Sequence, residues 1–134
     1  MKIGTLDGSI SFGLGSISRS LNRHDFLATE LGSRAESRLV SEKWWHFRIE
    51  PEDGIAGFVI FEGDRLHQVL ILIKMQSDSA DKWTVENELV RKTIHDEWLL
   101  RELGKPPYHY RWGDVASEYD EKGCVSDIVV TYAN

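Results

Sequence analysis

The chain has a single cysteine, Cys124, among its 134 residues. One thiol cannot close an internal disulfide, and a cysteine-based metal site needs more than one. The first residues do not resemble a signal peptide, because Met1 and Lys2 lead into glycine, serine and aspartate instead of a long apolar segment. The longest apolar run, Val69–Ile73, is far shorter than the roughly 20 residues that span a bilayer. We therefore expect a protein of the reducing cytoplasm with no membrane partner.

Clusters of basic residues are also lacking. The longest basic run is the pair Arg91–Lys92, and 22 acidic residues outweigh 16 basic ones, which gives a formal net charge of −6. The negative phosphates of a nucleic acid are repelled on average by such a surface. We therefore predict no nucleic-acid partner. A basic protein is the better candidate, because opposite net charge speeds encounter and favours binding.

The motifs of common enzymes and metal sites are absent as well. The chain has no Walker loop, no GxGxxG, no GxSxG and no CxxC, and its five histidines never show His-x-x-x-His spacing. His95, Asp96 and Glu97 are adjacent, but neighbours on a helix point about 100° apart and cannot converge on one atom. We therefore expect no metal, no cofactor and no enzymatic activity, and we assign no catalytic residue.

What the chain does contain is the pattern of one α+β domain covering residues 1–134. Its 41% hydrophobic and 28% charged residues are typical of a globular protein. Alternating apolar residues between turns predict strands at 39–49, 55–61, 66–75, 115–119 and 125–132. Capped segments predict helices at 22–31 and 85–103, and a polar loop is expected at 76–82. Since the connections are too short for parallel crossovers, we expect an antiparallel sheet of about five strands with the long helix packed on one face and a short N-terminal helix.

Cap residues mark the ends of both helices. Asn22 and Thr84 are residue types that cap helix N-termini. Gly32 and Gly104 stand where a left-handed C-terminal cap belongs. Between the helices, Val69–Ile73 is apolar at every position, which predicts a central strand covered at least in part on both faces.

The apolar residues of the long predicted helix fall on two opposing stripes. One stripe consists of Val85, Leu89, Leu99, Leu100 and Leu103, and the other of Val90, Ile94 and Trp98. One stripe is expected to pack on the sheet. The other needs a cover, and we favour cover from within the chain, by the N-terminal helix or loop, over a second protein.

Aromatic and polar residues at three places are candidates for a protein interface. The loop 106–112 is dense in aromatics, for which we favour packing over ligand binding. Trp44 and Trp45 point to opposite faces of a strand, so one of them is a candidate anchor. On the helix, His95 has usable spacing with Glu88 and Arg91, which we interpret as ordinary surface or half-buried pairs. The candidate interface residues are Trp44, His46, Glu88, His95, Trp98, Tyr108, His109 and Asp114.

A pattern of aromatic, acidic and glycine residues runs through the second half of the chain. It comprises Trp83, Glu86, Glu88, Arg91–Lys92, His95–Asp96, Trp98–Leu99, Leu103–Gly104, Trp112–Gly113, Ser117, Tyr119–Asp120, Gly123, Ser126, Ile128 and Tyr132. With the turn at 61–66, this pattern resembles a group of small, uncharacterised bacterial single-domain proteins over about two-thirds of the chain. The resemblance implies a helix, a Trp-Gly step and a closing hairpin in a small acidic cytoplasmic protein. Some bacterial domains of this size are immunity proteins that neutralise secreted toxins.

These observations favour a non-enzymatic protein-binding domain. Its most specific form is an immunity protein that neutralises a basic bacterial toxin domain, and a homodimer would bury the same apolar stripe without a foreign partner. The alternative is a small-molecule-binding domain or a small enzyme with a pocket near the aromatic loop 106–114. A deep pocket there, with His109 hydrogen-bonded to a carboxylate near Asp114 and Tyr110, would favour this alternative.

Overall fold

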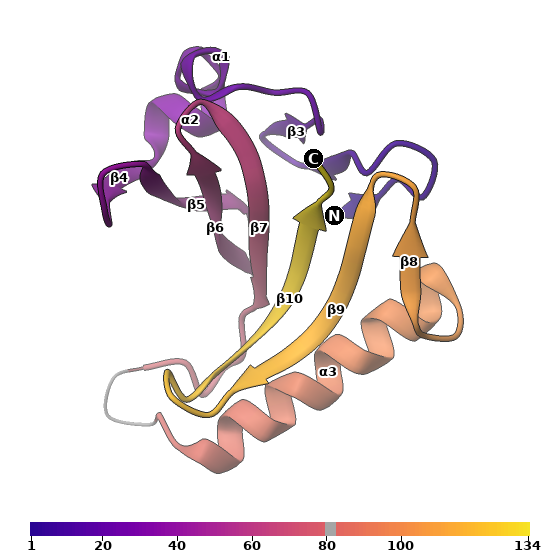
Figure 1. Cartoon of the computed structure of the whole chain (residues 1–134). Coiled ribbons are helices and arrows are strands. Elements are labelled where there is room, and N and C mark those ends of the chain that lie inside the picture. Colours follow the sequence, from indigo (N-terminus) through magenta and orange to yellow (C-terminus); the bar gives the residue numbers. More distant parts are fainter. Residues whose placement is uncertain (80–82) are drawn as a thin grey trace.

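The computed structural model describes residues 1–79 and 83–134, which form three helices and ten strands (Figure 1). Of the predicted loop 76–82, residues 80–82 lie outside the described part. The large sheet contains β4 (Glu36–Leu39), β5 (Trp44–Glu52), β6 (Ile55–Glu62), β7 (Arg65–Ile73), β8 (Tyr108–Tyr110), β9 (Gly113–Asp120) and β10 (Val125–Tyr132). The small sheet contains β1 (Lys2–Ile3), β2 (Ile10–Phe12) and β3 (Gly15–Ile17). The helices are α1 (Arg23–Ala28), α2 (Glu30–Arg34) and α3 (Val85–Leu103).

The large sheet is antiparallel throughout, in the order β4-β5-β6-β7-β10-β9-β8. The predicted α+β class and the antiparallel pairing are therefore confirmed. All five predicted strands have a counterpart, but the first, predicted at 39–49, begins only at Trp44, because residues 40–43 connect β4 to β5. The predicted number of strands, about five, is wrong, because the described residues form seven strands in one sheet and three in another. The additional strands are two to four residues long, too short to show a clear alternation of apolar residues.

One face of the large sheet, here called the inner face, carries the core. Phe47, Val59, Val69 and Val130 lie opposite one another across four neighbouring strands, as do Ile49, Gly57, Ile71 and Ile128. All of these apolar side chains are buried. As predicted, β7 is the central strand. Its alternate residues Leu70 and Leu72 point to the outer face and stay half-exposed, so this strand is fully covered on one side only.

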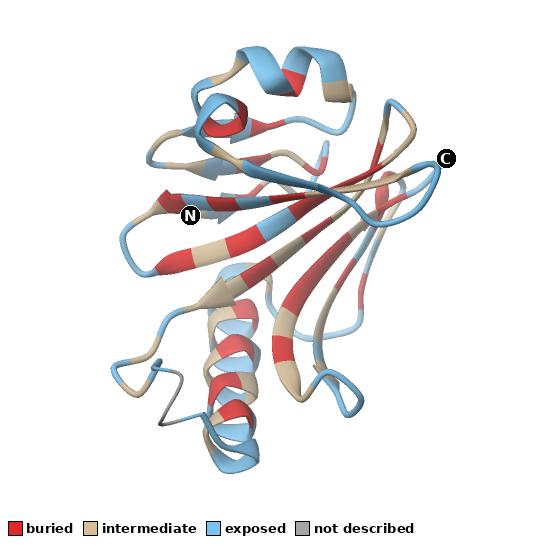
Figure 2. Cartoon of the chain, turned by 90° about the vertical axis from the view of Figure 1, so that its left-hand side faces the viewer, coloured by how far each residue is buried: buried red, intermediate tan, exposed pale blue. Residues whose placement is uncertain are grey.

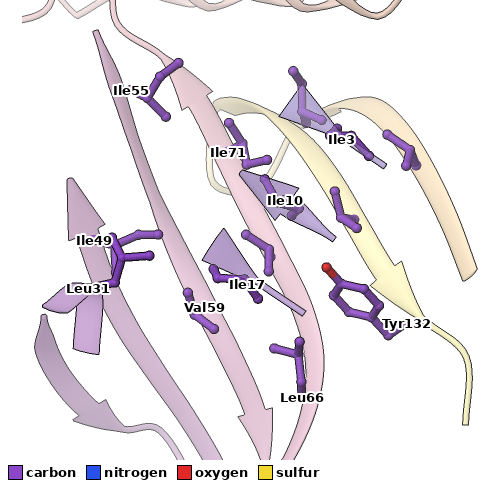
Figure 3. Packing of buried hydrophobic residues seen from close by; sticks show 14 of the residues in the cluster. Ile3, Ile10, Ile17, Leu31, Ile49, Ile55, Val59, Leu66, Ile71 and Tyr132 are labelled. Carbon is purple, nitrogen blue, oxygen red and sulfur yellow. The ribbon is translucent and has the colours of Figure 1, made fainter. Parts of the chain in front are cut away.

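The N-terminal segment covers part of the inner face. Ile3, Ile10 and Ile17 of the small sheet lie among the inner-face residues (Figure 3). Two long-range hydrogen bonds tie this segment to the C-terminal half: Trp112 Nε1 donates to the Thr5 carbonyl at 2.9 Å, and Tyr132 Oη donates to the Gly8 carbonyl at 2.8 Å. The small sheet is therefore part of the same packed core.

The predicted helix 22–31 is divided into two short helices at Thr29. Asn22 caps α1 as expected, because its side chain accepts a hydrogen bond from the Asp25 amide. Thr29 Oγ1 then donates to the Phe26 carbonyl and accepts from the Gly32 amide, so it ends α1 and begins α2. Gly32 therefore lies in the first turn of α2, and its predicted role as a C-terminal cap is wrong.

The long helix α3 has the predicted bounds, with Thr84 as its N-cap and Gly104 at φ 83° after its last turn. It packs against β9, β10 and the end of β7 (Figure 2). The prediction that an apolar stripe packs on the sheet is wrong: the buried residues of α3 are Glu88, Arg91, His95 and Leu99. Four of its apolar side chains are 40–53% exposed, namely Val85, Leu89, Val90 and Leu100. No helix among the described residues is long and apolar enough to span a membrane.

Candidate functional site

The helix α3 turns polar side chains toward the sheet and leaves apolar ones exposed. The reason lies where β7 and β10 separate. These strands pair from Gln68–Thr131 to Ile71–Ile128 and no further. The same register would next place Leu72 opposite Asp127 and then Ile73 opposite Ser126, but the strands part before these pairs can form. The amide and carbonyl groups of Ile73 and Ser126 then need other partners, because a buried backbone group without a hydrogen bond costs about 1–3 kcal/mol.

Three side chains of α3, here called the wedge, supply those partners. The Ile73 amide donates to Nε2 of His95 at 3.1 Å, and the Ile73 carbonyl accepts from Nη1 of Arg91 at 2.5 Å. The Ser126 amide donates to Oε1 of Glu88 at 3.0 Å, while the Ser126 hydroxyl donates to the Glu88 carbonyl at 2.6 Å. Glu88, Arg91 and His95 thus bind three of the four backbone groups at these two positions, which explains why α3 turns polar residues inward.

Arg91 lies between two carboxylates. Its guanidinium donates to Glu88 at 3.1–3.3 Å and to Asp78 Oδ2 at 3.0 Å, with a second contact from Nη2 to Asp78 Oδ1. Arg91 and Glu88 are each only 3% exposed. Burial opposes the charge of Arg91, but the hydrogen bonds that it donates to Asp78 and Glu88 outweigh this effect and raise the arginine pKa. The same guanidinium lowers the pKa of Asp78 below its ordinary value.

His95 is fully buried in the wedge. Burial, followed by the positive charge of Arg91, lowers its pKa to about 4, so the imidazole is neutral at pH 7. Nε2 accepts the Ile73 hydrogen bond, which places the imidazole proton on Nδ1. This Nδ1 has no hydrogen-bond partner in the described part of the chain.

On the outer face, the parting of β7 and β10 leaves a groove of about 770 Å³, here called the split groove. Its apolar wall comes from Phe58, Leu70 and Leu72 on β6 and β7, together with Trp83 and Val125. Its polar wall includes Ser77, Asp78, Asn87, Glu88, Arg91 and Asp127.

Asp127 is the unusual carboxyl group of the split groove. Burial first, and then the negative charge of Glu88, raise its pKa to about 6. Among residues 1–79 and 83–134 its carboxyl has no hydrogen-bond or salt-bridge partner. At neutral pH this carboxylate is therefore charged, half-buried and without a counter-ion on the described protein.

A second groove, of about 550 Å³, lies between α3, the loop after it and β9. Leu99, Tyr108 and Val115 line it, and His109 and Ser117 also reach it. His109 Nδ1 lies 2.6 Å from Asp114 Oδ1, and both side chains are largely exposed. Within the described residues Asp114 is the one hydrogen-bond partner of His109, so no hydroxyl or thiol is paired with the imidazole as a nucleophile would be.

The structure distributes the predicted interface residues over three separate regions. Trp44 and His46 are half-buried on β5, where their rings lie against His67 and Phe58. Glu88 and His95 are buried in the wedge and have almost no surface to offer a partner, and Trp98 is half-buried on the same helix. Near the second groove, Tyr108 is buried, whereas His109 and Asp114 are exposed. That these residues form a protein interface stays a prediction.

Sequence reasoning missed three residues of this region: Asp78, Asp127 and, as a buried group, Arg91. Asp127 did carry a signal, because it is the one charged residue in the otherwise uncharged strand 125–132. Asp78 carried no such signal in the sequence, because its role depends on a loop that contacts α3 only in the folded chain.

Comparison of the chain with protein-family models, with curated proteins and with solved structures finds no match. The resemblance to small bacterial proteins therefore stays a prediction.

In the described residues, no three His, Cys, Asp or Glu side chains are placed to hold a metal ion.

Proposed function

We propose that this domain acts by binding a basic protein, and that neutralisation of a bacterial toxin domain is the most specific form of that function. The observation that carries the proposal is the inverted helix α3. Because Glu88, Arg91 and His95 occupy its inner side, apolar residues are left facing solvent. Exposed apolar residues that gather on one surface are typical of interaction sites.

Three of these residues lie on one side of α3, here called the α3 flank. Val85, Leu89 and Leu100 fall within about 60° of one another on the helix at 100° per residue. Their exposed fractions are 40%, 47% and 53%. Side chains of this size serve as anchors when a partner covers them.

The charges around the α3 flank suit a basic partner. Glu86, Asp96 and Glu97 are exposed on the same helix, where, among the described residues, the one exposed basic residue is Arg101. Lys92 is paired with Asp96 at 3.1 Å, so its charge is partly compensated. Together with the net charge of −6, this acidic border would attract a positively charged protein and raise its association rate.

The first test uses Leu89→Gln combined with Leu100→Gln. The partner is the C-terminal domain of a large secreted protein encoded by a neighbouring gene, co-expressed and co-purified with this chain. Since each lost anchor typically costs about 1–2 kcal/mol, we expect the double variant to bind about 30- to 1,000-fold more weakly in calorimetry and to lose protection against the toxin.

The matched control is Leu39→Gln combined with Val40→Gln, because both residues are 51% exposed and lie outside α3. This control should bind and protect like the parent protein. Equal killing with and without the parent protein, without co-purification, would contradict the proposal. Sedimentation of the parent protein alone as a dimer that the α3 variant abolishes would assign the α3 flank to self-association instead.

The second candidate, a small enzyme or small-molecule binder at loop 106–114, is favoured by one observation. His109 is hydrogen-bonded to Asp114 at the border of a groove. A carboxylate in this position orients an imidazole in many acid–base catalysts. The pair lacks a bound nucleophile, and for that reason we rank this candidate below protein binding.

A further inference from the structure

We propose that the split groove binds a small organic cation, a primary ammonium carried on an apolar body. This site is distinct from the α3 flank. Asn87 and Arg91 line the split groove, and at 100° per residue they point away from Val85 and Leu89. The proposal therefore does not depend on a protein partner.

The charges of the split groove favour a cationic ligand. Arg91 is paired with Glu88 and Asp78, and Lys74 and Arg48 lie 3.5 and 3.8 Å from Glu50. Asp127 alone among these described acidic lining residues has no ion-pair or hydrogen-bond partner, although the charge of Arg91 acts on it from a distance. A half-buried carboxylate is stabilised most by a cation that also donates a hydrogen bond, as an ammonium group does.

The apolar wall indicates what the cation is attached to. Phe58 and Leu70 are cross-strand neighbours, as are Ala56 and Leu72, so their side chains form a continuous apolar surface. Phe58 is 39% exposed and Trp83 50% exposed, which leaves two aromatic rings uncovered at the groove. An aromatic or alkyl body would cover this surface, and the volume of about 770 Å³ is in the range of small-molecule sites.

Ser77 supplies a further polar contact. Its Oγ is buried at the split groove and has no hydrogen-bond partner in the described part of the chain. An ammonium group has three N–H donors, so it can serve Asp127 and also a hydroxyl. An anionic ligand would instead meet Asp127, Asp78 and Glu88, while the cationic lining residues Arg91, Arg48 and Lys74 are already paired with carboxylates.

The test is a titration of the full chain at pH 7.5 with three probes of similar shape, in which amide NMR reports binding. These are phenethylammonium, the neutral 2-phenylethanol and the anionic 3-phenylpropanoate. We expect phenethylammonium to shift the amides of residues 70–72 and 125–127 and to bind at least about tenfold more tightly than the neutral probe, because a charge-assisted hydrogen bond is lost with the charge. The anion should bind more weakly than either.

Asp127→Asn should remove the preference for the cation. Asp53→Asn is the matched control, because Asp53 is exposed, does not line the split groove and changes the net charge equally. It should leave binding within about twofold. Equal binding of the cation and the neutral probe, or an unchanged affinity in Asp127→Asn, would overturn the proposal.

A readout that needs no variant follows from the titration of Asp127. In the parent protein, affinity for phenethylammonium should fall several-fold, by up to about tenfold, between pH 7.5 and 5, because the carboxyl takes up a proton below a pKa of about 6. A pH-independent affinity would contradict the assignment even if the Asp127 variant failed to fold.

Discussion

Replacement of Arg91 by methionine is expected to lower the free energy of unfolding by about 3–5 kcal/mol at pH 7. The substitution removes the one cation between Glu88 and Asp78, and it leaves the Ile73 carbonyl without its donor. Glu88 is 3% exposed and would become an uncompensated buried charge. Since domains of this size are stable by about 5–15 kcal/mol, urea denaturation should show a large shift of the midpoint.

Two further variants separate the wedge from general effects on α3. Lys92→Met removes an exposed ion pair with Asp96 one residue away and should change stability by less than about 1 kcal/mol. Glu88→Gln combined with Arg91→Met should be more stable than Arg91→Met alone, because the glutamine keeps an acceptor for the Ser126 amide without the charge. If the stability losses of Glu88→Gln and Arg91→Met simply add in the double variant, Arg91 does not act by compensating the buried charge of Glu88.

Stability in acid is expected to depend on two buried groups that act in opposite directions. The pKa of His95 is lowered to about 4, so the unfolded chain takes up a proton before the folded one as pH falls below 6.5, and stability is lost toward pH 4. The pKa of Asp127 is raised to about 6, so its contribution is fully present below about pH 3.8 and is lost as pH rises through 6. Over pH 4–6 the two contributions partly cancel.

Single variants should expose the two contributions. Asp127→Asn is expected to lose stability more steeply than the parent between pH 6.5 and 4, by up to about 3 kcal/mol from His95. His95→Gln should lose stability less steeply than the parent over the same range, although it is less stable at pH 7 if the Ile73 hydrogen bond is weakened. Urea denaturation at intervals of half a pH unit measures both slopes.

The control is His109→Gln, because the His109 side chain is 73% exposed. Its replacement should leave the change of stability with pH as it is in the parent. The acid sensitivity of Asp78 is common to all three variants, so it cancels in the comparison with the parent. Parallel pH profiles for the parent, His95→Gln and Asp127→Asn would contradict this assignment.

Local signals account for the parts of the fold that were predicted. Thr84 and Gly104 bracket α3 at the expected residues, because a cap acts on the backbone within one turn of itself. The five longer strands follow from alternation, which is likewise a property of neighbouring residues. The prediction failed at Gly32, because Thr29 satisfies the backbone on both sides of it and starts a new helix first.

The candidate sites were less accessible to sequence reasoning. His109 and Asp114 were named together as residues to inspect, and the pairing of β8 with β9 places them opposite each other. Glu88 and His95 were named, but as ordinary surface or half-buried pairs. Arg91 and Asp127 were not named as site residues, because nothing in the local pattern shows that a strand pair will open beside them.

The sequence by itself determined the α+β class, the antiparallel hairpins and the length of α3, since all of these rest on interactions between residues close in the chain. Only the tertiary structure decided which side of α3 faces inward. The unpaired groups of Ile73 and Ser126 exist only once β7 and β10, more than fifty residues apart in the chain, have paired and then parted. Hydrogen bonding to those groups outweighs the burial of leucine and valine, so α3 turns Glu88, Arg91 and His95 inward and leaves its α3 flank to solvent.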